Sequence, residues 1–282
     1  MNIVKYEVFD MVASTLNFSK ASMSLNMSQS AVSKSIKSLE EEYGLPLFNR
    51  EKYGVSLTRF GQSLWPEIKA ILNQERRLNR LVNAHKNILK GKLVIGSFSS
   101  ASAKILPDLI HAYSQSYPDI QVEVKEGHYD EIKRWLEEGT IDVALLIEEF
   151  IDDYERKYIF SDKIKLLAPK GFNIGKRASI SIIEEYPFIV TEYYPNPYLT
   201  NLIKKYRVNP NTKYVVKTNT TVFAFVEKGL GVTLLPESSI LKSDFNIDMI
   251  DLEEDIIRNI YMATKEKNLK IPSVKALWTL KK

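Results

Sequence analysis

Short polar side chains and two lysines lie together in a stretch where they could contact the edges of bases. Residues 29–43 carry an apolar stripe at helical spacing, made of Val32, Ile36, Leu39 and Tyr43. The side chains at the start of this stretch and off the stripe are small or hydrogen-bonding: Ser28, Gln29, Ser30, Ser33, Lys34 and Lys37. Glutamine can bind an adenine edge and lysine can reach guanine or phosphate, while small residues let a helix enter the major groove. The pattern favours a helix that contacts DNA bases.

The neighbouring sequence predicts the elements that would position this helix. Ser28 is a good N-cap and Gly44 can adopt the left-handed conformation that ends a helix, so we expect a helix over 29–43. A shorter helix over 20–26 and a polar turn precede it. A first helix over 3–16 supplies apolar residues at helical spacing, which we expect in the core: Tyr6, Phe9, Ala13 and Leu16.

A hairpin is expected after the helix over 29–43. The segment 50–59 reads as two short strands around a turn at Tyr53 and Gly54, which would form the wing of a winged helix-turn-helix. Polar residues in and beside this wing would contact phosphate or the minor groove: Arg50, Lys52, Thr58 and Arg59.

The distribution of charge is compatible with nucleic-acid binding. The 282-residue chain has a net charge of +4, and residues 1–90 hold 13 Lys and Arg against 8 Asp and Glu. Residues 1–60 alone hold 7 against 6, so most of the positive excess follows them. A basic surface releases counterions from DNA, and this balance supports such binding without establishing it.

Composition excludes several classes of function. The chain has no cysteine, which excludes disulfides, thiol catalysis and thiolate metal sites. Its three histidines, His85, His111 and His128, are scattered and do not have metal-ligand spacing, so no metal or cofactor is expected. Nucleophile-elbow, P-loop and dinucleotide motifs are missing, and no catalytic residue is singled out. No apolar run reaches membrane-spanning length and the N-terminus lacks signal-peptide features, which predicts a cytoplasmic protein with no membrane partner.

A long helix is expected over residues 59–90. Its heptad seam is formed by Leu64, Ile68, Ile71, Glu75, Leu78, Val82, His85 and Leu89. A helix of this length, roughly 45 Å at ~1.5 Å per residue, has no internal partner of its own length. We therefore expect it to pair with the same helix of a second chain, giving a homodimer and, through it, a two-fold arrangement of DNA readers. The alternative is that it packs only on its own domain.

The remaining residues, 91–282, alternate strand and helix patterns. A βαβαβ series runs to Ile147, with a single helix expected over 103–116, and a second series follows to residue 235. The chain then returns through a strand at 260–264 and a final helix. Two α/β halves joined by crossing strands near 160 and 265 would enclose a cleft.

Two groups of hydroxyl residues are candidates for binding a small anion in this cleft. Ser99, Ser100 and Ser102 precede one helix, and Thr218, Asn219 and Thr220 precede another, where N–H groups and the helix dipole favour negative charge. Helix capping is the alternative for both groups. His128 is a further candidate. No arginine is singled out for the cleft. The segment 192–198 could supply an aromatic wall or polar contacts, but we favour a proline-rich surface loop there, with a helix expected over 198–206.

The N-terminal residues resemble the signature of LysR-type transcriptional regulators. The matching positions are Phe9, Phe18, Ser19, Ala21, Leu25, Ser28, Gln29, Ala31, Val32, Ser33, Ile36, Leu39, Glu40, Gly44, Leu47, Phe48, Arg50, Leu57, Thr58 and Gly61. Ser22 and Ser30 depart from the family pattern, which commonly has alanine and proline there. Later matches are mainly structural, and include Gly96, Pro107, Gly127 and the segment VEKGLGVTLLP at 226–236.

The resemblance implies an α/β multidomain chain. Its parts would be a winged helix-turn-helix DNA-binding domain (1–60), a dimerising linker helix (61–90) and an effector-binding regulatory domain (91–282). The last would consist of two α/β subdomains similar to type 2 periplasmic binding proteins, about 91–160 with 265–282 and about 161–264. The implied partners are double-stranded operator DNA, RNA polymerase and a small effector. The chain would also associate with itself as a homodimer or a tetramer.

Two other classes of function are open to the sequence. A small-molecule binding module could use the N-terminal helices for protein contact without DNA. An α/β enzyme would turn over a metabolite, although no residue specifically indicates one.

Overall fold

The computed structural model describes residues 3–51, 54–85, 91–191, 197–240 and 245–280. The chain divides into two compact units, one made of Met1–Gly91 with Glu137–Thr140 and the other of Lys92–Leu136 with Ile141–Lys282. In the part of the chain described, no helix combines the length and the apolar character needed to cross a membrane.

Four helices and one hairpin make up most of the first unit. Their bounds are α1 (Ile3–Thr15), α2 (Phe18–Ser24), α3 (Gln29–Tyr43), β1 (Phe48–Glu51), β2 (Gly54–Leu57) and α4 (Arg59–His85). The two strands pair antiparallel, with Phe48 opposite Leu57. The predicted helix-turn-helix and wing are therefore present.

Caps fix the ends of the two central helices. The Ser28 side chain accepts a hydrogen bond from the Ala31 N–H, and Gly44 closes α3 with φ of 69°. The bounds of α3 agree with those predicted from the sequence. α2 begins at Phe18, two residues before the predicted start, because the Asn17 side chain caps it by accepting from the Lys20 N–H.

The core of the first unit forms around the apolar stripe of α3. Val32, Ile36 and Leu39 are buried against side chains of α1, the hairpin and α4. The expectation that Leu16 belongs to this core is wrong, because α1 ends at Thr15 and Leu16 has φ of 47° and is 46% exposed.

α4 has two parts with different surroundings. In its first half, Ile68 and Leu72 are buried in the core of the unit, and the Trp65 indole N–H donates to Asp10 Oδ1 at 2.7 Å. Farther along, Leu78 is 60% exposed and Val82 is 43% exposed. Packing on its own unit therefore accounts for the first half of the predicted seam only. The expected end of the helix at 86–90, including Leu89, lies outside the described residues.

The second unit is built on one long sheet and a smaller one. Its elements are β3 (Gly91–Ser97), α5 (Ser99–Lys104), α6 (Leu106–Ser116), β4 (Ile120–Glu126), α7 (Tyr129–Glu138), β5 (Val143–Ile147), η1 (Glu148–Phe150), β6 (Glu155–Pro169), β7 (Arg177–Ala178), α8 (Ile182–Glu185), β8 (Phe188–Thr191), α9 (Pro197–Tyr206), β9 (Thr212–Val216), α10 (Asn219–Glu227), β10 (Thr233–Pro236), η2 (Glu237–Ser239), β11 (Ile247–Leu252), β12 (Ile257–Thr264), η3 (Glu266–Lys270) and α11 (Pro272–Thr279).

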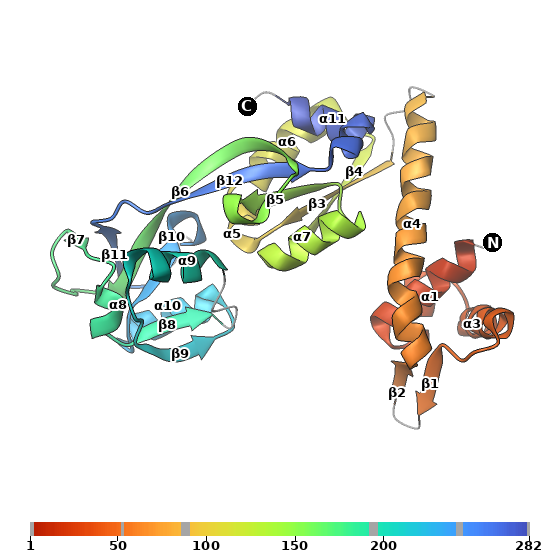
Figure 1. Cartoon of the computed structure of the whole chain (residues 1–282), viewed down its shortest axis with the longest axis horizontal. Helices are drawn as coiled ribbons and strands as arrows, with labels where there is room; N and C mark the ends of the chain where they lie inside the picture. Colours follow the sequence, from red (N-terminus) through yellow and green to blue (C-terminus); the bar gives the residue numbers. More distant parts are fainter. Residues whose placement is uncertain (1–2, 52–53, 86–90, 192–196, 241–244, 281–282) are drawn as a thin grey trace. The chain divides into compact units, whose positions relative to one another are not determined.

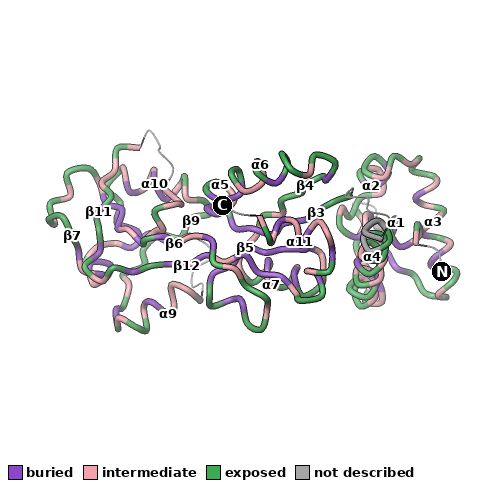
Figure 2. The backbone as a smooth tube through the Cα atoms, turned by 90° about the horizontal axis from the view of Figure 1, so that it is seen from above, coloured by how far each residue is buried: buried purple, intermediate pink, exposed green. Residues whose placement is uncertain are grey.

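Two strands run through both halves of this unit (Figure 1). The long sheet has the order β4-β3-β5-β12-β6-β11-β7, and β10 also pairs with β6. β12 pairs antiparallel with the first part of β6, residues 155–163, and the rest of β6 pairs with β10 and β11. They connect a first lobe, built around β3, β4 and β5, to a second lobe, built around β7 to β11. Figure 2 shows that buried residues alternate with exposed ones along parts of these two strands.

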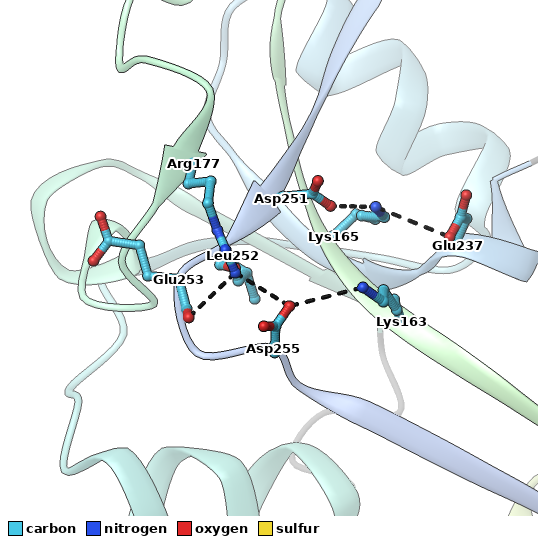
Figure 3. Close-up of polar contacts among 8 residues, drawn as sticks. All are labelled: Lys163, Lys165, Arg177, Glu237, Asp251, Leu252, Glu253 and Asp255. Atoms are coloured by element: carbon cyan, nitrogen blue, oxygen red, sulfur yellow. Dashed lines mark hydrogen bonds and ion pairs between the residues drawn. The ribbon is translucent and has the colours of Figure 1, made fainter.

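Three features of the second unit differ from the sequence-based expectation. The helix predicted over 103–116 is two helices, α5 and α6, because Pro107 sits in the first turn of a new helix after a break at Ile105. β11 and the short β7 were not expected. Their charged residues interrupt the apolar pattern but form ion pairs at the surface (Figure 3), such as Lys165 with Asp251 and Arg177 with Asp255.

Gly61 provides a test of packing in the first unit. A Cβ there would lie 2.3 Å from the Leu47 carbonyl oxygen, which is backbone and cannot move aside cheaply. Gly→Ala inside a helix normally stabilises, but we expect Gly61→Ala to destabilise the unit by about 1–3 kcal/mol. The measurement is urea unfolding followed by circular dichroism. Gly54→Ala, where a Cβ would meet nothing within 4 Å, is the control, and equal stability of the two variants would contradict this packing.

Candidate functional site

The predicted base-contacting face of α3 is open to solvent. Gln29, Ser30, Lys34 and Lys37 are exposed and Ser33 is half-buried. The acidic residues of the same helix gather at its C-terminal end, where Glu40 accepts hydrogen bonds from the Leu47 and Phe48 N–H groups. The N-terminal half of the helix therefore presents a polar surface without acidic side chains.

Contacts within the helix-turn-helix hold part of this face in place. The Ser19 hydroxyl donates to Gln29 Oε1 at 3.2 Å, which ties the amide to α2. The hydroxyls of Ser28 and Ser30 lie 3.0 Å apart. Because these side chains are already ordered, they would lose less conformational entropy on meeting a base.

The residues expected at the wing divide into three cases. Arg59 is exposed at the start of α4. The Thr58 hydroxyl donates to the Pro46 carbonyl at 2.8 Å and accepts from the Gly61 N–H at 3.0 Å, so it caps α4. Arg50 lies in β1 and its side chain is not described, and Lys52 is outside the described residues.

A buried ion pair occupies the crossing strands of the second unit. Arg258 of β12 stands directly opposite Asp162 of β6 in the antiparallel register. Arg258 Nη2 donates to Asp162 Oδ2 at 2.5 Å, and the two residues are 4% and 2% exposed. Burying two charges is costly unless each has further hydrogen-bond partners.

Residues of both lobes supply those partners. Arg258 Nη2 also donates to Ser100 Oγ of α5 at 3.1 Å and to Ser238 Oγ of η2 at 3.2 Å, and Nη1 donates to the Tyr129 hydroxyl at 3.0 Å. The Ser238 N–H donates to Asp162 Oδ1 at 3.0 Å, and the Ser238 hydroxyl also contacts Asp162. We call these five residues the Arg258 cluster.

Aromatic rings cover the guanidinium. Its Cζ lies 5.0 Å from the centroid of Phe98, and the Phe98 ring meets Tyr129 edge-on at 4.9 Å. Burial would lower the pKa of Arg258, but Tyr129 and Asp162 outweigh it and raise that pKa. Burial also raises the pKa of the Tyr129 phenol, although Arg258 lowers it in part. Arg258 is therefore a permanent cation beside a neutral phenol.

Four buried side-chain atoms in this unit have no hydrogen-bond partner within the described residues. They are Nε of Arg258, the Tyr198 hydroxyl, Ser102 Oγ and Glu254 Oε2. Tyr198 lies in the first turn of α9 and packs against the cores of both lobes. Burial raises the pKa of its phenol, with Arg258 acting in the opposite direction. Unpaired buried donors are uncommon in native proteins and point to a missing partner.

The candidate effector residues fall in different places. Ser100 belongs to the Arg258 cluster, whereas Ser99 is exposed. His128 is half-buried just before Tyr129, and its backbone N–H donates a hydrogen bond to Glu131 Oε2 at 3.0 Å.

The second hydroxyl group shows a capping geometry. Thr218 caps α10 by accepting from the Thr221 N–H, which is the alternative that the sequence left open. Asn219 and Thr220 occupy the first turn of α10, and none of the three belongs to the Arg258 cluster. Their role in ligand binding stays a prediction.

No arginine was singled out from the sequence, but the structure places one among residues of both lobes. Arg258 is placed between the lobes by its pairing with Asp162, which lies 96 residues earlier in the chain. The available sequence signal was a lone arginine inside the apolar strand segment IIRNIYMAT at 256–264. The surface loop favoured for the segment ending at Tyr198 does not fit Tyr198, since its hydroxyl is buried. The helix predicted from Tyr198 onward is present as α9.

The described ranges contain no group of three or more His, Asp or Glu side chains that could hold a metal ion.

Comparison with known proteins gives two family matches. Residues 3–62 match the bacterial regulatory helix-turn-helix protein model of the LysR family, and residues 86–281 match the LysR substrate binding domain. YvbU, an HTH-type transcriptional regulator of Bacillus subtilis strain 168, is 27% identical over 281 residues, covering 98% of this chain and 93% of YvbU. The probable HTH-type regulator LrrA of Synechococcus elongatus is 28% identical over 97% of this chain and 94% of its own.

Solved structures show the same fold. Full-length CbnR, solved in complex with its target DNA, superposes with a TM-score of 0.74 at 20% identity, over 99% of this chain and 98% of CbnR. The matching families and relatives are regulators of transcription and not enzymes. Together with the helix-turn-helix of the first unit and the two-lobed second unit, these matches show that the chain belongs to the LysR family of DNA-binding transcriptional regulators, with a C-terminal effector-binding domain.

Proposed function

We propose that the protein binds a two-fold-related operator as a homo-oligomer and responds to a small anionic metabolite. The exposed polar face of α3 is the observation that carries this proposal. Gln29, Ser30 and Ser33 would contact base edges, while Lys34, Lys37 and Arg59 would contact phosphate or guanine. The DNA complex of the structurally similar CbnR supports the same use of the fold.

Dimerisation would place two α3 helices on one duplex. Leu78 and Val82 continue the heptad seam beyond the part of α4 that packs on its own unit, and both are exposed in the single chain. Exposed apolar residues at coiled-coil spacing favour pairing with an identical helix. A two-fold dimer spaces its recognition helices about one turn of DNA apart. Tetramers would form through further contacts between such dimers.

The effector would bind between the lobes of the second unit. Ser100 and Arg258 provide donors there, and Ser99, Ser102, His128, Thr218, Asn219 and Thr220 remain candidate contacts. The ligand must bind two arrangements of the lobes with different affinity, since otherwise it would shift nothing. The altered lobes would change the spacing of the DNA readers and their contact with RNA polymerase. The protein would act in the cytoplasm.

The operator test begins with sequencing of genomic fragments that co-purify with the chain. On the operator so identified, Gln29→Ala is expected to cost ~1–3 kcal/mol for the preferred base at one position and to relax preference there. Arg59→Ala is the matched comparison, and should weaken all sequences alike and lower the salt dependence. Gel-shift titrations on single-base variants of the site measure both. Unchanged base preference in Gln29→Ala would remove this residue from direct readout.

The oligomer test uses the exposed part of α4. Leu78→Glu would place a charge in the seam and is expected to weaken self-association at least about tenfold, corresponding to ~1.4 kcal/mol. Arg76→Glu changes the charge at an exposed position on another face of the same helix. This variant should leave the molecular mass of the oligomer in solution unchanged. Analytical ultracentrifugation reports both. A dimer of undiminished affinity in Leu78→Glu would place the interface elsewhere.

A further inference from the structure

The Arg258 cluster ties the two lobes of the effector-binding domain together. Arg258 and Asp162 belong to the crossing strands, Ser100 belongs to α5 of the first lobe, and Ser238 belongs to η2 of the second. α5 and η2 lie in contact. A change in the partners of Arg258 would therefore act on the contact between the lobes.

The guanidinium needs an anionic partner wherever it stays buried. Removing one member of a buried ion pair leaves an uncompensated charge, which is strongly destabilising. Exposed pairs differ, because water can replace either partner; Arg177 and Asp255, 3.1 Å apart at the surface, are an example (Figure 3). A ligand that displaced Asp162 from Arg258 would have to carry a negative charge itself.

Asp162 does not use the full binding capacity of Arg258. Its Oδ2 accepts from Nη2, the nitrogen that also serves Ser100 and Ser238, while Nε has no partner in the described part of the chain. A carboxylate prefers two parallel hydrogen bonds from a guanidinium. The Tyr198 hydroxyl is a further buried donor without a described partner, and it lies within electrostatic range of Arg258.

We propose that Asp162 is an internal substitute for the acidic group of the effector. A small carboxylic acid would take the Nε and Nη2 donors of Arg258 with the help of the Tyr198 hydroxyl. Asp162 would then lose the guanidinium, its contacts to Ser238 would weaken, and the contact between α5 and η2 would loosen. This inference rests on the proposed role of the domain as an effector receptor, and it names the chemical class of the ligand and the group that competes with it.

The first experiment measures carboxylate binding in the full-length chain. Asp162→Asn keeps the volume and an acceptor for the Ser238 N–H but removes the competing charge. Acetate is the probe, at ~100 mM against sodium chloride of equal ionic strength. It is expected to raise the melting midpoint of Asp162→Asn by roughly 3–6 °C and to leave the wild type unchanged. Because Asn fills the place of Asp162, this acetate must bind on the Nε side.

Three controls define the site and the ligand class. Adding Tyr198→Phe to Asp162→Asn should reduce the acetate response, and Asp255→Asn, at the exposed pair, should show none. Acetamide, which has the same shape without the charge, should have no effect. A larger response to inorganic phosphate than to acetate would overturn the carboxylate class. No response of Asp162→Asn to acetate would overturn the proposal.

Ser238→Ala keeps the test available if Asp162→Asn does not fold. It retains both charges but removes a contact that holds Asp162. Acetate at ~100 mM should therefore raise the melting midpoint of Ser238→Ala, while that of the wild type stays unchanged. Equal sensitivity of the two proteins would contradict the competition between Asp162 and the ligand.

The second experiment asks whether the exchange acts as a switch. DNase footprints of Asp162→Asn on the identified operator should change when acetate is added, while wild-type footprints should not. If Asp162→Asn binds acetate but its footprint does not change, the ion pair of Arg258 and Asp162 has only a structural role. That result would overturn the proposal that the exchange acts as a switch. Failure of the wild type to bind any operator would instead contradict the proposed function, and the melting experiment would still report on the site.

Discussion

The antiparallel register of β6 and β12 is the constraint on which the second unit depends. It sets Arg258 against Asp162 and, one residue along, Ile257 against Lys163. Successive side chains of a strand point to opposite faces, so a slip of one residue would move the arginine from the buried face to the exposed one. The same two strands carry both lobes. The register therefore decides at once where the charge lies and which elements surround it.

The buried pair has a different physical character from the ion pairs at the surface of the same sheet. Surface pairs such as Lys170 with Asp248, which lie 2.7 Å apart, are solvated and contribute little to stability. Arg258 and Asp162 have lost that solvation, and their neighbours must satisfy them. The hydroxyls of Ser100, Tyr129 and Ser238 do so from three separate elements. Such a pair is weak evidence for stability, but it fixes the geometry of the groups that meet at it.

The two units place their functional residues by different means. In the first unit, the polar face of α3 is simply the side of the helix left over when Val32, Ile36 and Leu39 enter the core. One helix with two good caps is enough to present it. In the second unit the cluster draws on β6, β12, α5, α7 and η2, and no single element presents a site. The difference suits a rigid reader of DNA and a receptor whose parts can change their contacts.

The sequence by itself determined the parts that depend on neighbours a few residues apart. Ser28 and Gly44 set the ends of α3, the apolar stripe set its buried face, and the heptad spacing indicated a long α4, because caps and periodicity act within one or two turns. Only the tertiary structure showed β7 and β11, the exposed position of Leu16 and the division of α5 from α6. It was also needed to find the roles of Arg258, Asp162 and Tyr198. These residues are far apart in the chain, and only the pairing of β6 with β12 and the packing of α9 against both cores bring buried charge and unpaired donors into one place.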